Sequence, residues 1–290
     1  MSLLEALLLG LVQGVFMFVP VSSTSHLVLT QHWLLEGGSS LPPPESPEMV
    51  LFDLVVHVGT LVSIVVVMRV GLRDLVVGVV DDWRGGLLAP SRLCRDGLRG
   101  AVATRVIALM LLTTAVTGAL GLLLRDHLTS AVFGAPAAVA GALLVTGAML
   151  WWTDHMRDTW RGPAEVTVGI AVAVGLAQAA ALTPGISRSG VTIFVALLLG
   201  LQRPMAARYS FYVAIPTILA ASGVQALDVI GAGDLTIGWA PMAVAFVVAA
   251  IVGAAALWVV LRLLEQARFR IFAVYVVVLA LAVLVSGTGV

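Results

Sequence analysis

The sequence predicts an all-α integral membrane protein with six transmembrane helices and two re-entrant helical hairpins in an inverted-topology repeat. Composition is the first reason: 60% of the 290 residues are hydrophobic, 11% are charged and the mean hydropathy is +1.07, values typical of proteins with several spans. Two long apolar stretches are also each interrupted near the middle by a polar run that contains proline. Arginines, finally, gather in alternate loops, as they do in membrane proteins.

Charge and cysteine content narrow the classes of function. The net charge is zero, so charge gives no basis for binding to nucleic acid, and we expect no such partner. The single cysteine, Cys94, excludes a disulfide within the chain. The first apolar stretch lacks a basic leading segment and a small-residue cleavage site, so we expect it to belong to the mature protein.

Six apolar stretches have the length of an ordinary membrane span, about 20 residues. Two further stretches, 3–35 and 165–202, are longer and are broken by their polar runs. Broken helices are tolerated at membrane depth only where the turn is buried in protein or lines a cavity. The six ordinary spans are expected at about residues 50–69, 104–124, 135–153, 209–226, 240–262 and 271–288.

Loop charges predict how the broken stretches enter the membrane. Segment 69–105 carries seven arginines, whereas 31–49 carries glutamates and no basic residue. The positive-inside rule places the arginine-rich loops in the cytoplasm. The six spans then alternate only if 3–35 begins and ends outside while 165–202 begins and ends inside. Both stretches are therefore expected to be re-entrant hairpins that meet near the midplane.

A short repeat supports this arrangement. Gly10-Leu11-Val12-Gln13 precedes the first polar run and Gly175-Leu176-Ala177-Gln178 precedes the second. We interpret residues 1–290 as one membrane domain made of two repeats, about 1–124 and 135–290. The first repeat includes a cytoplasmic connector at 70–103, in which an amphipathic surface helix is possible.

The two polar runs carry groups that bind phosphate. The first is Pro20-Val21-Ser22-Ser23-Thr24-Ser25-His26 and the second is Pro184-Gly185-Ile186-Ser187-Arg188-Ser189-Gly190. Turns that lead into helices expose backbone N–H groups to an anion, and the arginine offers a fork that matches phosphate oxygens. The histidine can act as general acid, general base or nucleophile. Together they indicate one site for a lipid-linked phosphate or diphosphate.

Structural roles compete with these functional ones. A single serine or threonine in a membrane helix usually bonds to a carbonyl of its own or a neighbouring helix. An intramembrane arginine, by contrast, is rare and is functional by default, which favours Arg188. His57 lies less than two turns into a span, so a structural role and a place in the cavity wall are equally supported. Asp53 is a second candidate for the cavity wall or marks the membrane interface.

These residues resemble the bacitracin-resistance-type undecaprenyl-diphosphate phosphatases. The matching segments cover nearly the whole chain: Gly10 to Gln13, Pro20 to Thr24 with His26, Phe52-Asp53 with Gly59-Thr60, Pro184 to Thr192, and Tyr209-Ser210-Phe211 with Ala214 and Pro216. The resemblance implies six spans with two re-entrant hairpins and hydrolysis of undecaprenyl diphosphate to the cell-wall carrier lipid. It also implies a multi-pass protein of the inner or plasma membrane, a site open to the outer face, and a divalent cation, Mg²⁺ or Ca²⁺. A homodimer is a further hypothesis.

The resemblance also assigns roles to individual residues. It implies catalytic positions at His26, Ser23 and Arg188. Phosphate oxygens would be held by Ser22, Thr24, Ser187, Ser189 and Gln13, and the metal ligands are unknown.

One departure affects the expected chemistry. The family has a glutamate four residues after the position of Gln13, and this chain has Met17 there. Spacing i, i+4 keeps both side chains on one helix face, but a thioether is a poor ligand for Mg²⁺ or Ca²⁺. Three explanations follow: slow hydrolysis with water or Asp53 supplying the negative charge, hydrolysis of a related lipid diphosphate, or binding of polyprenyl phosphate by a transporter or flippase that does not cleave it.

Overall fold

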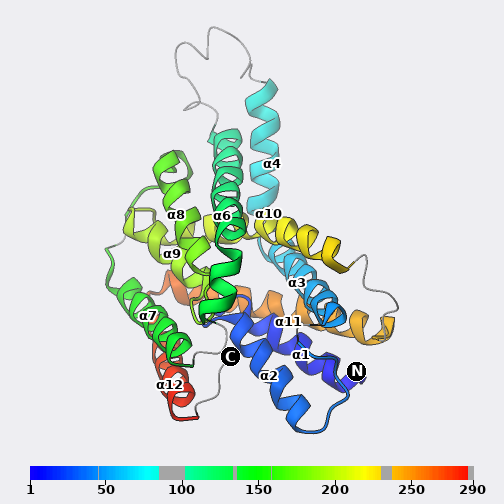
Figure 1. The fold of residues 1–290 in the computed structure, drawn as a ribbon. Helices are drawn as coiled ribbons and strands as arrows, with labels where there is room; N and C mark the ends of the chain where they lie inside the picture. The colour runs from blue at the N-terminus through cyan, green and yellow to red at the C-terminus, as the bar shows by residue number, and fades with distance from the viewer. Residues whose placement is uncertain (45, 85–101, 133–135, 158, 230–236, 287–290) are drawn as a thin grey trace.

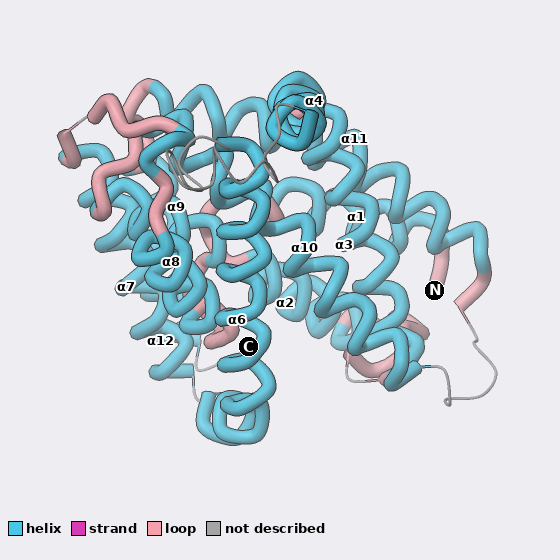
Figure 2. Tube along the Cα trace, turned by 90° about the horizontal axis from the view of Figure 1, so that it is seen from above, coloured by secondary structure: helices cyan, strands magenta, loops and turns pink. Residues whose placement is uncertain are grey.

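The computed structural model describes residues 1–44, 46–84, 102–132, 136–157, 159–229 and 237–286, and these form helices joined by loops (Figure 1). No strand lies within those ranges (Figure 2). The helices are α1 (Leu3–Phe16), α2 (Ser23–Glu36), α3 (Pro47–Val67), α4 (Arg69–Arg84), α6 (Val102–Val132), α7 (Pro136–His155), α8 (Val168–Ala180), α9 (Arg188–Leu198), α10 (Arg203–Val229), α11 (Trp239–Glu265) and α12 (Arg270–Ser286), with a 3-10 turn at Pro163–Glu165.

Local sequence explains where several of these helices begin. At α1 the Ser2 hydroxyl accepts a hydrogen bond from the Glu5 amide, and the Glu5 carboxylate accepts one from the Ser2 amide. This reciprocal cap satisfies two N–H groups that have no partner inside the helix. Ser46 caps α3 in front of a proline at the first helical position, and Thr167 caps α8.

Both long apolar stretches are broken at their polar runs, as the sequence predicted. The first forms α1 and α2, and the second forms α8 and α9. These helices have 11 to 14 residues. At a rise of about 1.5 Å per residue each is shorter than the ~30 Å hydrocarbon core of a bilayer. A single helix of this length does not cross a membrane.

Four helical segments are long and apolar enough to cross a membrane, and they match four of the six predicted spans. The predicted span at 209–226 lies inside α10, which contains Pro216, and the one at 271–288 overlaps α12. The four segments are Pro47–Val67, Val102–Leu123, Ala137–His155 and Trp239–Glu265.

Small residues let the short helices pack closely on long ones. Helix α1 packs against α11, and α8 packs against α6. A Cβ atom added at Gly10 would lie 2.7 Å from the Ala245 carbonyl oxygen, and one at Gly175 would lie 2.9 Å from the Thr113 carbonyl oxygen. The glycine of each Gly-Leu-x-Gln repeat is therefore required because the backbones of the two packed helices lie too close for a side chain. Such close contacts are typical of helix pairs in membranes.

The expected connector at 70–103 contains a helix. Helix α4 projects from the bundle beside α6 (Figure 1), and no side chain in it is buried. Its Asp82 carboxylate accepts hydrogen bonds from the amide and hydroxyl of Thr104, which joins α4 to the start of α6. Exposed Val76 and Trp83 share the helix with charged residues, so it is amphipathic. Residues 85–101 lie outside the described part of the chain.

Candidate active site

The turns of the two hairpins meet, as the sequence predicted. In Figure 1 helices α1 and α2 lie in the lower part of the view, and α8 and α9 lie at the upper left. The Ser189 hydroxyl lies 3.5 Å from the carbonyl oxygen of Phe18, and the Arg188 Nη2 atom lies 3.7 Å from the Met17 sulfur. Residues about 170 positions apart in the sequence therefore form one polar cluster.

The first turn has an unusual backbone. Helix α1 ends at Phe16, and α2 begins at Ser23 after the proline of the first run. Ser22, which precedes α2, adopts a positive φ of 71°, a conformation uncommon for residues with a Cβ. The chain thus reverses direction within the polar run, and the hydroxyls gather at the start of α2.

The second turn is held by a threonine of α7. Gly185 adopts a φ of +92°, and a Cβ there would lie 2.6 Å from the Val139 carbonyl oxygen, so glycine is required. The Thr146 hydroxyl donates to the Gly185 carbonyl at 2.9 Å and accepts from the Ser187 amide at 3.2 Å. Sequence analysis did not identify Thr146, because it belongs to a separate apolar stretch.

Arg188 is the first residue of α9 and points into the cluster. Its Nη1 atom is buried and has no hydrogen-bond partner among the described residues. A buried guanidinium N–H without a partner is costly, and a carboxylate or phosphate is the usual partner of an arginine fork. The Met17 sulfur beside it is only a weak acceptor. The arrangement therefore favours an anion at this position.

The hydroxyls of the two runs divide into two groups. Ser22 and Ser25 bond to each other at 3.0 Å, and Ser187 caps α9 by accepting from the Gly190 amide at 3.2 Å. These contacts are structural. The hydroxyl groups of Ser23 and Thr24 form no hydrogen bond with the described residues; Ser23 is half-buried and Thr24 is exposed. Their hydroxyls are free to donate to a ligand.

His26 is buried and held at both ring nitrogens. Its Nδ1 atom lies 2.8 Å from the Ser22 carbonyl oxygen, and its Nε2 atom lies 2.8 Å from the Tyr275 hydroxyl. Phe16 stacks on the imidazole with the ring centroids 3.9 Å apart. Sequence analysis missed both aromatic partners. The one indication in the sequence that Tyr275 has a special role was its hydroxyl group inside the last apolar stretch.

Gln13 and Met17 share one face of α1, as their spacing predicted. The Gln13 side chain is fully buried, and neither its amide oxygen nor its amide nitrogen has a hydrogen-bond partner in the described ranges. A buried amide with both ends unsatisfied is rare in a native protein. Because Met17 contacts Arg188, this unsatisfied amide lies one helical turn from the cluster.

Asp53 and His57 lie on one turn of α3. The Gln31 amide donates to the Asp53 carboxylate at 3.1 Å, and His57 Nδ1 donates to the Asp53 carbonyl oxygen at 2.7 Å. These contacts within α3 do not separate the two roles of His57, so the structural role and the place in the cavity wall both stay predictions.

Comparison with known proteins identifies the family. The family model described as "Bacitracin resistance protein BacA" matches residues 6–282. The chain belongs to the BacA family. It is 48% identical to the undecaprenyl-diphosphatase of Alkalilimnicola ehrlichii over 289 residues, which cover 98% of this chain and 96% of that protein. It is 44% identical to the undecaprenyl-diphosphatase of Halorhodospira halophila over 288 residues, covering 99% and 98% of the two chains. It is 34% identical to undecaprenyl-diphosphatase 2 of Stutzerimonas stutzeri over the full length of both.

Membership in the BacA family and the apolar helices identify a multi-pass membrane protein.

The family resemblance implied a divalent cation, which would need several oxygen ligands near the cluster. Within the described ranges, no group of three or more His, Cys, Asp and Glu side chains is arranged to hold a metal ion. Asp53 is bonded to Gln31, and Met17 supplies only sulfur. The described His, Cys, Asp and Glu side chains near the cluster therefore do not form a complete cation site by themselves.

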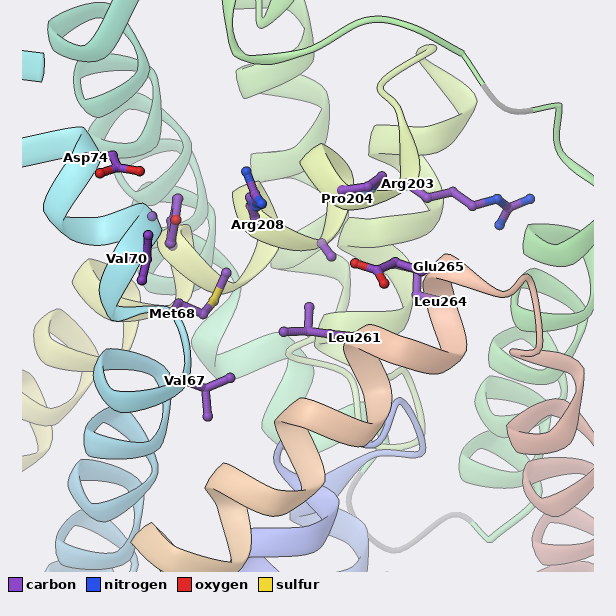
Figure 3. Close-up of a pocket in the computed structure, with 13 residues that line it drawn as sticks. Val67, Met68, Val70, Asp74, Arg203, Pro204, Arg208, Leu261, Leu264 and Glu265 are labelled. Carbon is purple, nitrogen blue, oxygen red and sulfur yellow. The ribbon is translucent and has the colours of Figure 1, made fainter.

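A cavity elsewhere in this BacA-family protein is distinct from the cluster. It has a volume of about 220 Å³ and lies between α3, α4, α10 and α11 (Figure 3). Asp74, Arg208 and Glu265 lie on its wall, and its apolar lining includes Leu261 and Leu264. None of the residues predicted for the site lines it, so we do not include it in the active site.

Proposed function

We propose that this BacA-family protein hydrolyses undecaprenyl diphosphate to undecaprenyl phosphate and inorganic phosphate. The reaction would recycle the carrier lipid of cell-wall synthesis and confer resistance to bacitracin. The observation that carries the proposal is Arg188, whose buried Nη1 atom lacks a partner among the described residues where two proline-containing turns meet. Full-length relatives named undecaprenyl-diphosphatase support the same activity.

Each side chain of the cluster has a role in this reaction. Arg188 binds two oxygens of the terminal phosphate and stabilises the charge that develops on them. Ser23 and Thr24 donate hydroxyl hydrogen bonds to that phosphate, with Ser22, Ser187 and Ser189 shaping the turns around it. The attacking group is Ser23, water or His26, and it forms a new bond to the terminal phosphorus as the bond to the bridging oxygen breaks and undecaprenyl phosphate leaves. Where Ser23 or water attacks, His26 takes up the proton of the attacking group. Where Ser23 or His26 attacks, water then hydrolyses the phosphoenzyme and releases inorganic phosphate.

The proposed topology has six spans and two re-entrant hairpins. The short lengths of α1, α2, α8 and α9 support the hairpins, because each pair turns back at its polar run. The packing of α1 on α11 and of α8 on α6 supports the inverted repeat, with boundaries near 1–124 and 135–290. The arginine-rich loops support a cytoplasmic face opposite the site opening, in the inner or plasma membrane. A homodimer stays a hypothesis.

In this proposal a divalent cation would be bound by the oxygens of the substrate. Mg²⁺ and Ca²⁺ prefer oxygen ligands, and a lipid diphosphate supplies several. The side chains around Met17 and Arg188 do not complete a cation site, so no step of the reaction is assigned to the ion. When bound, such an ion would neutralise charge on the phosphate oxygens.

The transporter hypothesis raised by Met17 is not favoured. The relatives carry the name of a hydrolase, and Arg188, Ser23 and His26 all contribute groups that hydrolysis needs. An inverted repeat is shared by many transporters, but a fold by itself does not determine the reaction.

The test is phosphate release from undecaprenyl diphosphate by the purified protein in detergent. The assay is run with Mg²⁺, with Ca²⁺ and with a chelator, beside an Arg188→Ala variant. We expect release that depends on Arg188. A folded wild-type protein that binds the lipid and releases no phosphate would overturn the proposal.

A further inference from the structure

Aromatic side chains from two separate helices surround His26. Phe16 of α1 stacks on the imidazole with an interplanar angle of 21°. Tyr275 of α12 lies beside the imidazole, with the ring centroids 5.8 Å apart and the planes again at 21°. Its hydroxyl therefore approaches the edge of the imidazole, where the Nε2 lone pair lies, at 2.8 Å. The two hydrogen-bonded residues are 249 positions apart in the sequence.

The two hydrogen bonds of His26 define its tautomer. A carbonyl oxygen only accepts, so the contact with the Ser22 carbonyl requires a hydrogen on Nδ1. In the neutral ring Nε2 then carries a lone pair, and the Tyr275 hydroxyl must donate to it. A phenol can reverse this role: once Nε2 is protonated, Nε2–H donates and the Tyr275 oxygen accepts. The contact is therefore compatible with both protonation states of the ring.

We propose that Tyr275 is a positioning residue for the reaction: the Ser22 carbonyl sets the Nδ1–H tautomer of His26, and the Tyr275 hydroxyl holds the ring by Nε2, the nitrogen that exchanges the proton once the substrate takes the place of the hydroxyl. The inference rests on the proposed function for its link to catalysis. Tyr275 acts through His26 and needs no contact with the substrate. The Tyr275 side chain is 42% exposed. Replacing it with phenylalanine removes the hydroxyl and keeps the aromatic ring.

The hydrogen-bond partners of the His26 ring are uncharged groups. Among the described residues they are the Ser22 carbonyl and the Tyr275 hydroxyl. An effect of Tyr275→Phe on the pH dependence of the rate can therefore be separated from the loss of a charged partner. The titratable groups on the helices around His26 are Glu5 on α1, His32 and Glu36 on α2, Glu48, Asp53 and His57 on α3, Arg188 on α9 and Arg270 on α12.

The kinetic test compares Tyr275→Phe with Tyr212→Phe. Tyr212 lines the separate cavity between α4 and α10, so its substitution serves as a matched control. We expect Tyr275→Phe to lower kcat on the order of ten-fold, a part of what general acid–base catalysis contributes, with KM within about two-fold. The pH profile of kcat should shift in Tyr275→Phe alone. Unchanged kcat and pH profile, or a raised KM with normal kcat, would overturn the assignment.

A spectroscopic test does not depend on activity. The protein is labelled with ¹⁵N-histidine, and the His26 signals are identified among five histidines by a His26→Gln variant. We expect wild-type His26 to show the Nδ1–H tautomer with a hydrogen-bonded Nε2, and Tyr275→Phe to change the Nε2 shift. The Tyr212→Phe spectrum should match wild type. A His26 signal that is the same in Tyr275→Phe and wild type would refute the positioning role even if kcat fell.

The two tests separate this inference from the proposed function. If wild-type protein releases no phosphate but Tyr275→Phe changes the His26 signal, hydrolysis is wrong and the contact between Tyr275 and His26 Nε2 stands. If phosphate is released and the His26 signal does not respond, hydrolysis stands and the role of Tyr275 is wrong.

Discussion

The Arg188 guanidinium contacts the thioether of Met17, at the position where the family resemblance implies a glutamate. Its Nη2 atom lies 3.7 Å from the Met17 sulfur, and Met17 is 6% exposed. A glutamate there would form a buried ion pair with the arginine, whereas sulfur is a weak, neutral acceptor. The Nη1 atom of Arg188 has no partner among the described residues, and in the proposed function the substrate phosphate takes that place.

Replacing Met17 with glutamate should raise phosphatase activity on the order of ten-fold and strengthen its dependence on Mg²⁺ or Ca²⁺, because a carboxylate restores a hard oxygen ligand. Activity is measured as phosphate release across a titration of the cation. Met17→Gln is the matched control, since it adds polarity without charge and should not gain cation dependence. Equal activity of the glutamate and glutamine variants in folded protein would argue against a carboxylate role at this position.

Removing the guanidinium should abolish both binding and hydrolysis. We expect Arg188→Ala to reduce the rate by a factor on the order of 10² to 10³, as for other groups that stabilise transition-state charge. Arg188→Lys should recover part of the lipid-phosphate binding but little of the rate, because lysine keeps the charge and loses the two-point fork. Binding is measured with the lipid phosphate in detergent. Retained binding in the alanine variant would mean that the phosphate lies elsewhere.

Gln13 should matter for activity and not for folding. Its buried amide forms no hydrogen bond with the described residues, so Gln13→Leu should leave the melting temperature unchanged or raise it while phosphate release falls. Gln178→Leu is the matched control. The Gln178 amide donates to Thr117 at 3.0 Å and to Thr217 at 3.1 Å, so its loss should destabilise the protein by about 1–2 kcal/mol. Full activity of Gln13→Leu would exclude the amide from substrate binding.

Close packing at Gly10 should make that position intolerant of a side chain. Gly10→Ala places a Cβ 2.7 Å from the Ala245 carbonyl oxygen, and overpacking of this kind costs about 1–3 kcal/mol. At Gly118, in α6, no atom lies within 4 Å of the added Cβ, so Gly118→Ala should be neutral or stabilise the helix by up to about 1 kcal/mol. Thermal unfolding in detergent compares the two. A stable Gly10→Ala variant would show that α1 does not approach α11 this closely.

Much of the fold could be predicted from the sequence. The breaks in 3–35 and 165–202 were predicted because proline and clustered hydroxyls interrupt an apolar helix in a purely local way. Four of the predicted spans are matched by helices long and apolar enough to cross a membrane, and the repeated Gly-Leu-x-Gln segments did mark equivalent close contacts. Loop charge added the prediction that the two hairpins meet, and the contacts of Ser189 with Phe18 and of Arg188 with Met17 agree with it.

Other features of the site could not be predicted in this way. The sequence resemblance assigned Ser23 to catalysis and Ser22 and Thr24 to phosphate binding, but it did not indicate that the Ser22 hydroxyl bonds to that of Ser25. Rotamers and turn geometry decide such pairings, and a positive φ at Ser22 has no sequence signal of its own.

The sequence by itself determined that this is a helical membrane protein, where its helices break, and which side chains gather at the breaks. Hydropathy and helix-breaking residues act over short stretches, so these features can be read locally. Only the tertiary structure decided that Tyr275 holds His26, that Thr146 holds the second turn, and that Arg188 faces a sulfur. Each of these contacts joins helices that are distant in the chain, and their distances depend on how whole helices pack rather than on any neighbouring residue.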